Sequence, residues 1–219
     1  MRQLAQVHDG DVDVLVGTQM VAKGHDFRRV SLVAALNPDG ALFSADFRAP
    51  ERLFSLLLQA AGRAGRDAQL GAKQACEMWV QTFHPAHPVF EFLKRHDFAG
   101  FAAQQLQERE QAGLPPFSFQ ALLRAEARTQ QAAQDFLNAA KALGEARLPN
   151  GGMGLSVYPA VPMSMQRVAN VERAQMLVES PSRKHLQPFL AAWQDDLQQL
   201  RVQHKAVLRW AIDVDPLAI

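Results

Sequence analysis

The chain has 219 residues, of which 48% are hydrophobic and 21% charged, and its 23 basic and 22 acidic side chains nearly cancel. This balance excludes the polybasic class of nucleic-acid binder, so any contact with DNA or RNA must come from a local groove. The single cysteine, Cys76, excludes a disulfide scaffold and a cysteine-built zinc site within this sequence, and it favours a reducing, cytoplasmic compartment. The longest apolar run, Leu53–Ala61, is far shorter than the ~20 residues of a membrane span, so we expect no transmembrane segment.

The first half of the sequence predicts strands that alternate with helices. Three stretches are typical of buried strands: Asp11–Gly17, Ser31–Leu36 and Gln74–Phe83. A helix is predicted from about Pro50, since proline suits the first helical turn, and glycines at 62 and 65 would end it. Two short helices are predicted over Pro88–Gln111. The alternation predicts an open α/β layer with too few strands for a complete domain, so we expect its sheet to expose an apolar face.

The second half begins after the turn residues Gly113–Pro116, which mark a domain boundary. Beyond them the predicted order is strand, helix, strand, strand, helix, strand. The ranges are Phe119–Ala127, Gln130–Ala146, Leu155–Tyr158, Val171–Glu179, Arg183–Leu200 and Ala206–Val214. This βαββαβ order is that of the split-βαβ or ferredoxin-like fold.

One stretch with chemical character is Gly17–Phe27, a loop between two predicted strands. Loops at the carboxyl ends of α/β strands are where such sheets bind ligands. Here a hydroxyl, an amide, a lysine and an aspartate lie near two glycines, which let backbone N–H groups approach a phosphate.

The second such stretch is Gln59–Arg66, where Arg63 and Arg66 lie three residues apart at a predicted helix end. Planar guanidinium groups pair with phosphate oxygens and neutralise the charge that develops in phosphoryl transfer. Taken alone, the pattern is also typical of a helix end with solvated arginines. Its combination with the loop Gly17–Phe27 favours nucleotide chemistry.

Other notable residues favour structural roles. His84 and His87 have a spacing found in metal sites, but a proline follows each of them, so we expect a rigid turn and no zinc. The three tryptophans lie on apolar faces of predicted elements and are expected in the core: Trp79, Trp193 and Trp210.

These motifs resemble those of a helicase family. Gln-x-x-Gly-Arg-Ala-Gly-Arg at 59–66 resembles motif VI of superfamily 2 helicases, and Gly-Thr-Gln-Met-x-Ala-Lys-Gly-His-Asp-Phe at 17–27 resembles motif V. The form of motif V also resembles that of the primosomal protein N′ (PriA) family of replication-restart helicases. Further stretches fit that family: Asp39–Arg48, Gln81-Thr82-x-x-Pro85, Leu114–Phe117 and Asp213–Pro216. The match covers nearly the whole chain, but only the C-terminal portion of the family.

The resemblance implies an α/β fold in three parts. Residues 1–86 would be the C-terminal part of a RecA-like helicase lobe 2 that carries motifs V and VI. Residues 87–112 would be a helical connector, and residues 113–219 a small α+β, ferredoxin-like (βαββαβ) C-terminal domain.

The resemblance also implies roles for particular residues. Gln59, Arg63 and Arg66 would face the ATP phosphates, the two arginines as arginine fingers, and Asp26 and Gly24 would lie near the nucleotide. Thr18, Gln19 and Lys23 in motif V would lie near the DNA backbone or the lobe interface. In the C-terminal domain, Arg167 and Arg173 would contact DNA. Asn170 and Glu172 depart from the family pattern, because they stand where it has a glycine and an aromatic residue.

The function implied is that of an ATP-dependent 3′-to-5′ DNA helicase that restarts stalled replication forks, using ATP and Mg²⁺. Zinc belongs to the full-length family, but its cysteines are absent here. The implied partners are forked and single-stranded DNA, single-stranded-DNA-binding protein, and primosome and helicase-loading proteins, with no membrane. The implied location is cytoplasmic and nucleoid-associated.

Two observations limit that function. The sequence contains neither a Walker A pattern nor an Asp-Glu pair suited to Walker B, so we expect the chain alone not to hydrolyse ATP. An alternative of a different class is a non-catalytic DNA-binding or protein-docking module expressed as a short product. A third, a superfamily 2 enzyme that acts on RNA, is disfavoured by the form of motif V.

Overall fold

The structure, a computed structural model, describes residues 12–18, 30–44, 46–64, 76–148 and 154–217. Its contacts divide the chain into two compact units, residues 1–106 and 107–219. The first unit contains β1 (Leu32–Leu36), α3 (Asp39–Leu42), α4 (Ala49–Ala61), β2 (Glu77–Gln81), α6 (Pro88–Lys94) and the start of α7 (Phe98–Gln111). The second contains β3 (Phe119–Ala127), α8 (Gln130–Ala146), β4 (Ser156–Val157), β5 (Val161–Val168), β6 (Val171–Ser180), α9 (Arg183–Gln203) and β7 (Val207–Val214).

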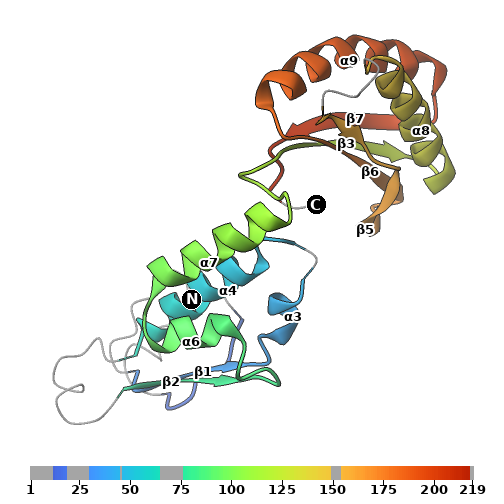
Figure 1. The fold of residues 1–219 in the computed structure, drawn as a ribbon. Helices are drawn as coiled ribbons and strands as arrows, with labels where there is room; N and C mark the ends of the chain where they lie inside the picture. Colours follow the sequence, from blue (N-terminus) through green and yellow to red (C-terminus); the bar gives the residue numbers. More distant parts are fainter. Residues whose placement is uncertain (1–11, 19–29, 45, 65–75, 149–153, 218–219) are drawn as a thin grey trace. The chain divides into compact units, whose positions relative to one another are not determined.

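The described sheet of the first unit consists of the parallel strands β1 and β2, paired from Leu32 opposite Glu77 to Leu36 opposite Gln81. Helices α4, α6 and α7 lie on one side of this sheet (Figure 1). The helix predicted from about Pro50 is α4, and Gly62 follows its last residue as its C-cap. The chain therefore passes from β1 through a helical crossover to the parallel strand β2, which is the order typical of an α/β fold.

The core of the first unit forms where α4 meets α6 and α7. In α4, Leu53, Phe54 and Leu57 lie on one helical face, and the ring of Phe54 stacks on Phe101 with centroids 4.5 Å apart. The buried members of this core are Leu42, Leu53, Phe54, Leu57, Val89, Phe90, Leu93 and Phe101. The helices that we expected to serve as a connector thus contribute apolar side chains to a core.

The other face of the β1–β2 sheet is exposed and largely apolar, with Glu77 and Gln81 as its polar members. Alternation turns Ala35, Met78 and Val80 toward the core, so their neighbours point away from it. Leu36 is 74% exposed and Trp79 is 60% exposed. The expected exposed apolar face is therefore confirmed, but the expectation that Trp79 lies in the core is wrong.

The prediction of a strand over Asp11–Gly17 is also wrong for the residues of this range that the structure describes. Residues 12–18 belong to no strand and are exposed throughout, and Val16 is 88% exposed. A β-branched run has no intrinsic preference strong enough to form a strand without a neighbouring strand that accepts its hydrogen bonds.

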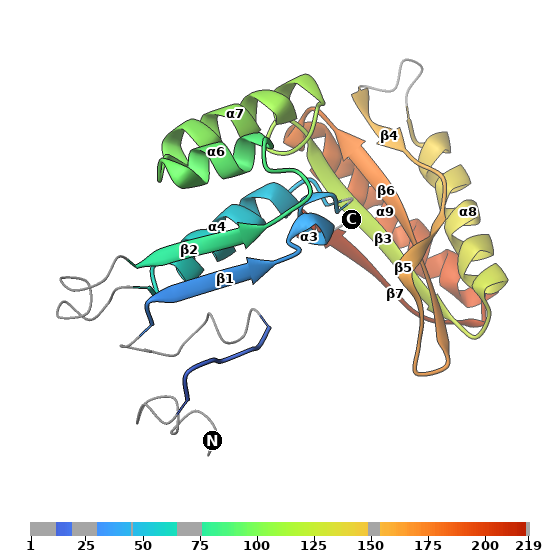
Figure 2. The same cartoon turned by 90° about the horizontal axis from the view of Figure 1, so that it is seen from below.

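The second unit contains an antiparallel sheet covered on one face by α8 and α9 (Figures 1 and 2). Its order is β4-β6-β3-β7, and β5 also pairs with β6, with every described pairing antiparallel. The predicted strands and helices of this half are found, with ends that differ by at most three residues. Both units contain helices and strands, as predicted.

Trp193 is at the centre of the second unit's core. Its side chain is fully buried and its Nε1 donates a hydrogen bond to the Ala140 carbonyl at 3.0 Å, which joins α9 to α8. Gly144 lets the two helices approach, because a Cβ there would lie 3.3 Å from Trp193 atoms. The expectation of a core tryptophan is confirmed for Trp193, and Trp210 packs against the same core while partly exposed.

Strand β5 was not predicted. Apolar Val161, Met163 and Met165 alternate along it, but most of its residues are exposed on both faces, and a proline within a run argues against a strand. It pairs with β6 through the two-residue turn Ala169-Asn170, whose φ angles are 48° and 63°. Positive φ at both central residues is typical of the type I′ hairpin turn, and asparagine tolerates it better than most residues.

Candidate functional site

The last turn of α4 carries two of the predicted nucleotide-facing residues, Gln59 and Arg63. The Nε2 of Gln59 donates to Ser55 Oγ at 3.3 Å, on the side of the helix away from the core. The helical turn continues past Ala61, since the N–H of Gly62 bonds the Leu58 carbonyl and the N–H of Arg63 bonds the Ala60 carbonyl, both at 3.0 Å. A packed helix therefore fixes the backbone of Arg63.

The two ends of α4 lie at opposite edges of the β1–β2 sheet (Figure 2). The helix begins after β1 and α3, beside the carboxyl ends of the strands, and runs back toward the start of β2. Gln59 and Arg63 thus lie at the amino edge of the sheet. Over its 13 residues the helix spans about 20 Å.

At the carboxyl edge, the chain segments that leave β1 and β2 are joined through Asp39. This buried carboxylate accepts hydrogen bonds from the Thr82 hydroxyl and, at 2.9 Å, from the Phe83 N–H. The two hydrogen bonds, led by that from Thr82, together with the nearby His84, hold the pKa of Asp39 below the usual range of an aspartate. The loop after β2 is therefore tied to the loop after β1.

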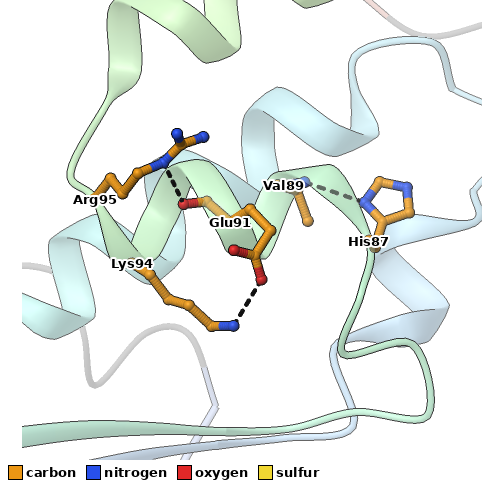
Figure 3. A network of polar contacts seen from close by, with 5 residues as sticks. All are labelled: His87, Val89, Glu91, Lys94 and Arg95. Carbon is orange, nitrogen blue, oxygen red and sulfur yellow. Dashed lines mark hydrogen bonds and ion pairs between the residues drawn. The ribbon is translucent and has the colours of Figure 1, made fainter.

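His84 and His87 follow in the same loop and have structural contacts. The ring of His84 packs edge-on against Phe43, with centroids 4.6 Å apart. The Nδ1 of His87 accepts the Val89 N–H at 3.3 Å and so caps α6 (Figure 3). Since Nδ1 is an acceptor, the cap assigns the ring proton of neutral His87 to Nε2.

Farther along α6, side chains bond back to the helix itself (Figure 3). Lys94 Nζ lies 2.7 Å from Glu91 Oε1, and the Arg95 Nε donates to the Glu91 carbonyl at 3.2 Å. The ion pair with Lys94 lowers the pKa of Glu91. These contacts stabilise the surface of α6 locally and form no concave site.

Most of the predicted motif V residues, and Arg66, lie outside the described part of the chain. This holds for Gln19, Lys23, Gly24, Asp26 and Arg66. Thr18 is described, but it is exposed and belongs to no helix or strand. Of the predicted residues in the first unit, the structure therefore brings together Gln59 and Arg63.

Arg167 lies near the β5–β6 hairpin turn, on a largely exposed strand. Its guanidinium lies 3.5 Å from Glu172 Oε1 and donates from Nη2 to Asn170 Oδ1 at 3.0 Å. The two residues that depart from the family pattern, Asn170 and Glu172, are therefore the ones that hold Arg167. Asn170 has a φ of 63°, in the left-handed region, which asparagine tolerates better than most residues other than glycine.

Arg173 is not beside Arg167, because successive residues of β6 point to opposite faces of the sheet. Arg167 is paired with Glu172, whereas Arg173 lies on the face away from α8 and α9, 3.6 Å from Glu126 Oε1. On that face further polar pairs cross the strands: Gln120 with Glu179 and Arg124 with Asp213. The two predicted DNA-binding arginines are thus on different faces, and each is ion-paired.

Sequence reasoning gave no role to the junction of Asp39 with Thr82 and Phe83. A signal for it exists, since the turn Asn37-Pro38-Asp39-Gly40 and the run Gln81-Thr82-x-x-Pro85 both follow a predicted strand. The carboxyl ends of parallel strands meet at one edge, so these two turns had to be neighbours.

Two family models match the chain. The model described as primosomal protein N C-terminal domain matches residues 110–217, and the helicase conserved C-terminal domain matches residues 1–68. No described helix is long and apolar enough to cross a membrane. Among the described residues, no group of three His, Cys, Asp or Glu side chains is placed to hold a metal ion.

Curated relatives match nearly the whole chain. It is 39% identical to the replication restart protein PriA of Haemophilus influenzae over 97% of this chain and 28% of that protein. It is 35% identical to the protein of the same name from Synechocystis over 99% of this chain and 24% of that one, and 34% identical to that of Treponema pallidum over 99% and 31%. The chain thus spans about a quarter to a third of the length of these relatives.

Proposed function

The chain belongs to the PriA family of replication restart proteins, and we propose that it provides part of an ATP-dependent 3′-to-5′ DNA helicase that restarts stalled replication forks. Its contribution would be the arginine fingers, part of the DNA track and a C-terminal domain that binds DNA and partner proteins. The observation that carries the proposal is the placement of Gln59 and Arg63 at the end of a helix whose other face is packed in the core.

The chemistry proposed for this helix end is stabilisation of the charge that develops during phosphoryl transfer. A guanidinium held by a packed backbone needs little reorganisation when the charge appears, which is what makes electrostatic stabilisation effective. Arg66 would act with Arg63. Gln59 would exchange its long hydrogen bond to Ser55, at 3.3 Å, for a phosphate oxygen.

The metals of the family fit this chain differently. Mg²⁺, which would supply positive charge to the phosphates of ATP, does not fit the described helix end, because Gln59 and Arg63 offer no anionic ligand. Zinc does not fit, because the sequence has one cysteine and the described residues form no cluster of metal-binding side chains. We assign no zinc site to this chain.

The second unit supports the finer proposal of a ferredoxin-like domain. The order β7-β3-β6-β4, with antiparallel neighbours and both helices on one face, is what a split-βαβ arrangement requires. Arg167 and Arg173 would contact DNA phosphates from the two faces of this sheet after exchanging their acidic partners, Glu172 and Glu126. The proposed partners, at the nucleoid, are forked and single-stranded DNA, single-stranded-DNA-binding protein and helicase-loading proteins.

A chimera tests the arginine finger. This chain replaces the matching segment of the Haemophilus influenzae relative, and DNA-stimulated ATP hydrolysis is measured with and without Arg63→Lys. Lysine keeps the charge but loses the planar fork, so we expect kcat to fall on the order of 10³-fold while DNA affinity stays unchanged.

Arg95→Lys is the matched control, since Arg95 is an exposed arginine of the same unit whose guanidinium bonds a helix carbonyl. It should leave kcat unchanged. Equal loss in both variants, or none in Arg63→Lys, contradicts the arginine finger. An inactive chimera that still binds forked DNA favours the alternative, a non-catalytic DNA-binding or docking module.

A further inference from the structure

Phe83 is an exposed aromatic side chain on a loop that is firmly held. Its ring is 79% exposed, although its own backbone N–H bonds the buried Asp39 carboxylate at 2.9 Å. The preceding Thr82 hydroxyl donates to the same carboxylate and accepts the His84 N–H at 3.0 Å. A buried carboxylate thus fixes the backbone on both sides of a ring that contributes little to the core.

A second exposed aromatic lies at the same edge of the sheet. Phe43 follows α3, is 58% exposed, and has the ring of His84 edge-on against it with centroids 4.6 Å apart. Both aromatics follow the carboxyl ends of β1 and β2, whose last residues, Leu36 and Gln81, are paired. The carboxyl edge therefore presents Phe83, Phe43 and His84 together, which we call the aromatic edge.

The chemistry of the aromatic edge suits a flat, unsaturated ligand that carries negative charge nearby. The loop from Thr82 to His87 contains no acidic residue, and both oxygens of Asp39 already accept hydrogen bonds. A phosphate backbone is therefore not repelled from within this loop. Every nucleobase offers a π face to an aromatic ring, so such stacking does not depend on sequence.

The aromatic edge is separate from the residues proposed to face ATP. Gln59 and Arg63 lie at the other edge of the same sheet, so a ligand bound at the carboxyl edge would not compete with ATP for these residues (Figure 2). We propose that Phe83, supported by Phe43 and His84, is a platform on which a base of single-stranded DNA stacks. This inference rests on the proposed helicase function and adds a DNA contact that lies outside motifs V and VI.

Anisotropy of a labelled oligothymidine with the full chain, over a salt series, tests the platform. Phe83→Ala should weaken binding on the order of 5- to 100-fold, and Phe83→Trp should retain it, because indole also stacks. The slope of log affinity against log salt should stay unchanged, since that slope counts phosphate contacts. Trp79→Ala, which removes an exposed aromatic from the sheet face, should have no effect.

An abasic strand separates bases from phosphates. On it, the wild-type chain and Phe83→Ala should bind equally, because the phosphates remain and the stacking partner is gone. Photocross-linking of iodouracil-substituted DNA to the peptide that contains Phe83 would place the base directly. Thermal unfolding of each variant shows whether a loss reflects the fold.

The outcomes distinguish this inference from the proposed function. If the chain binds DNA with a salt-dependent affinity that Phe83→Ala leaves unchanged, the platform is refuted while the helicase proposal stands, and a protein partner becomes the occupant to seek. If the wild-type chain binds no single-stranded DNA even at low salt, the platform is again refuted. The arginine finger is then still judged by the chimera.

Discussion

The two units bury their apolar residues to different extents. In the second unit, α8 and α9 cover one face of a complete antiparallel sheet, and the other face carries cross-strand polar pairs. In the first unit, the helices cover one face of a parallel pair of strands, while Leu36 and Trp79 remain exposed on the other. The helix-free face of the second unit's sheet thus carries polar pairs, whereas the corresponding face of the first unit's sheet leaves large apolar side chains exposed.

The largest expected effect on stability comes from replacing a tryptophan by alanine, in one variant for each unit. Trp193→Ala should lower the free energy of unfolding of the second unit by about 3 to 5 kcal/mol, because it empties a core site and leaves the Ala140 carbonyl without its partner. Trp79→Ala should change it by less than about 0.5 kcal/mol. Urea unfolding followed by hydrogen exchange assigns each loss to its unit, and similar losses in both variants would abolish the contrast.

The next largest effect is expected from acid, which should weaken the hydrogen bonds that Asp39 accepts from Thr82 and Phe83. Because the folded-state pKa of Asp39 is lowered, its stabilising contribution is present above the unfolded value, near 3.9, and is lost as the pH falls below it. Asp39→Asn should therefore destabilise the first unit at neutral pH, and the difference from wild type should shrink as the pH drops below about 4.

Equilibrium unfolding at several pH values measures this difference. Asp196, whose pKa is lowered by its hydrogen-bonded ion pair with Arg147, gives the matching variant Asp196→Asn in the second unit. Each variant should change hydrogen exchange in its own unit alone. A pH-independent effect of Asp39→Asn would show that its carboxylate charge is not what matters.

The smallest effect on stability is expected at the helix end. Gly62 has a negative φ, and a Cβ there would meet only helix carbonyls at 3.5 and 3.7 Å, so Gly62→Ala should change stability by less than about 0.5 kcal/mol. In the chimera, the added methyl group beside Arg63 should nevertheless lower ATP hydrolysis on the order of tenfold, because small displacements of positioned groups are costly. Gly40→Ala, with open space around its Cβ, is the control.

The contrast between the units also explains which elements were predictable. In the second unit, each of these elements buries one face, so the spacing of its apolar residues predicts it well. The predicted bounds of Phe119–Ala127 and Gln130–Ala146 agree with the observed bounds at both ends. Strand β5 is missing from the predicted strand order because it contains Pro162 and ends at a turn without glycine, so neither the run nor the turn has the usual signal of a hairpin.

In the first unit, the same reasoning failed where a surface lacks a covering element. Val14 and Val16 suggested a buried strand, and Trp79 suggested the core, but burial depends on neighbours that a local pattern does not reveal. The roles of Gln59 and Arg63 were predicted from the resemblance to motif VI and stay predictions, although the structure describes both residues at the end of α4. The contact of Asp39 with Thr82 joins positions 43 residues apart, so only the parallel pairing of β1 and β2 discloses it.

The placement of Arg63 and Phe83 at opposite edges of one sheet has a genetic consequence. If Arg63 and Phe83 have the roles proposed for them, substitutions at one edge would leave the side chains of the other edge unchanged, so selection could adjust ATP hydrolysis and DNA binding separately. A screen for alleles that lose one capacity and keep the other should find losses of ATP hydrolysis at the Arg63 end of α4 and losses of DNA binding in the loop that contains Phe83.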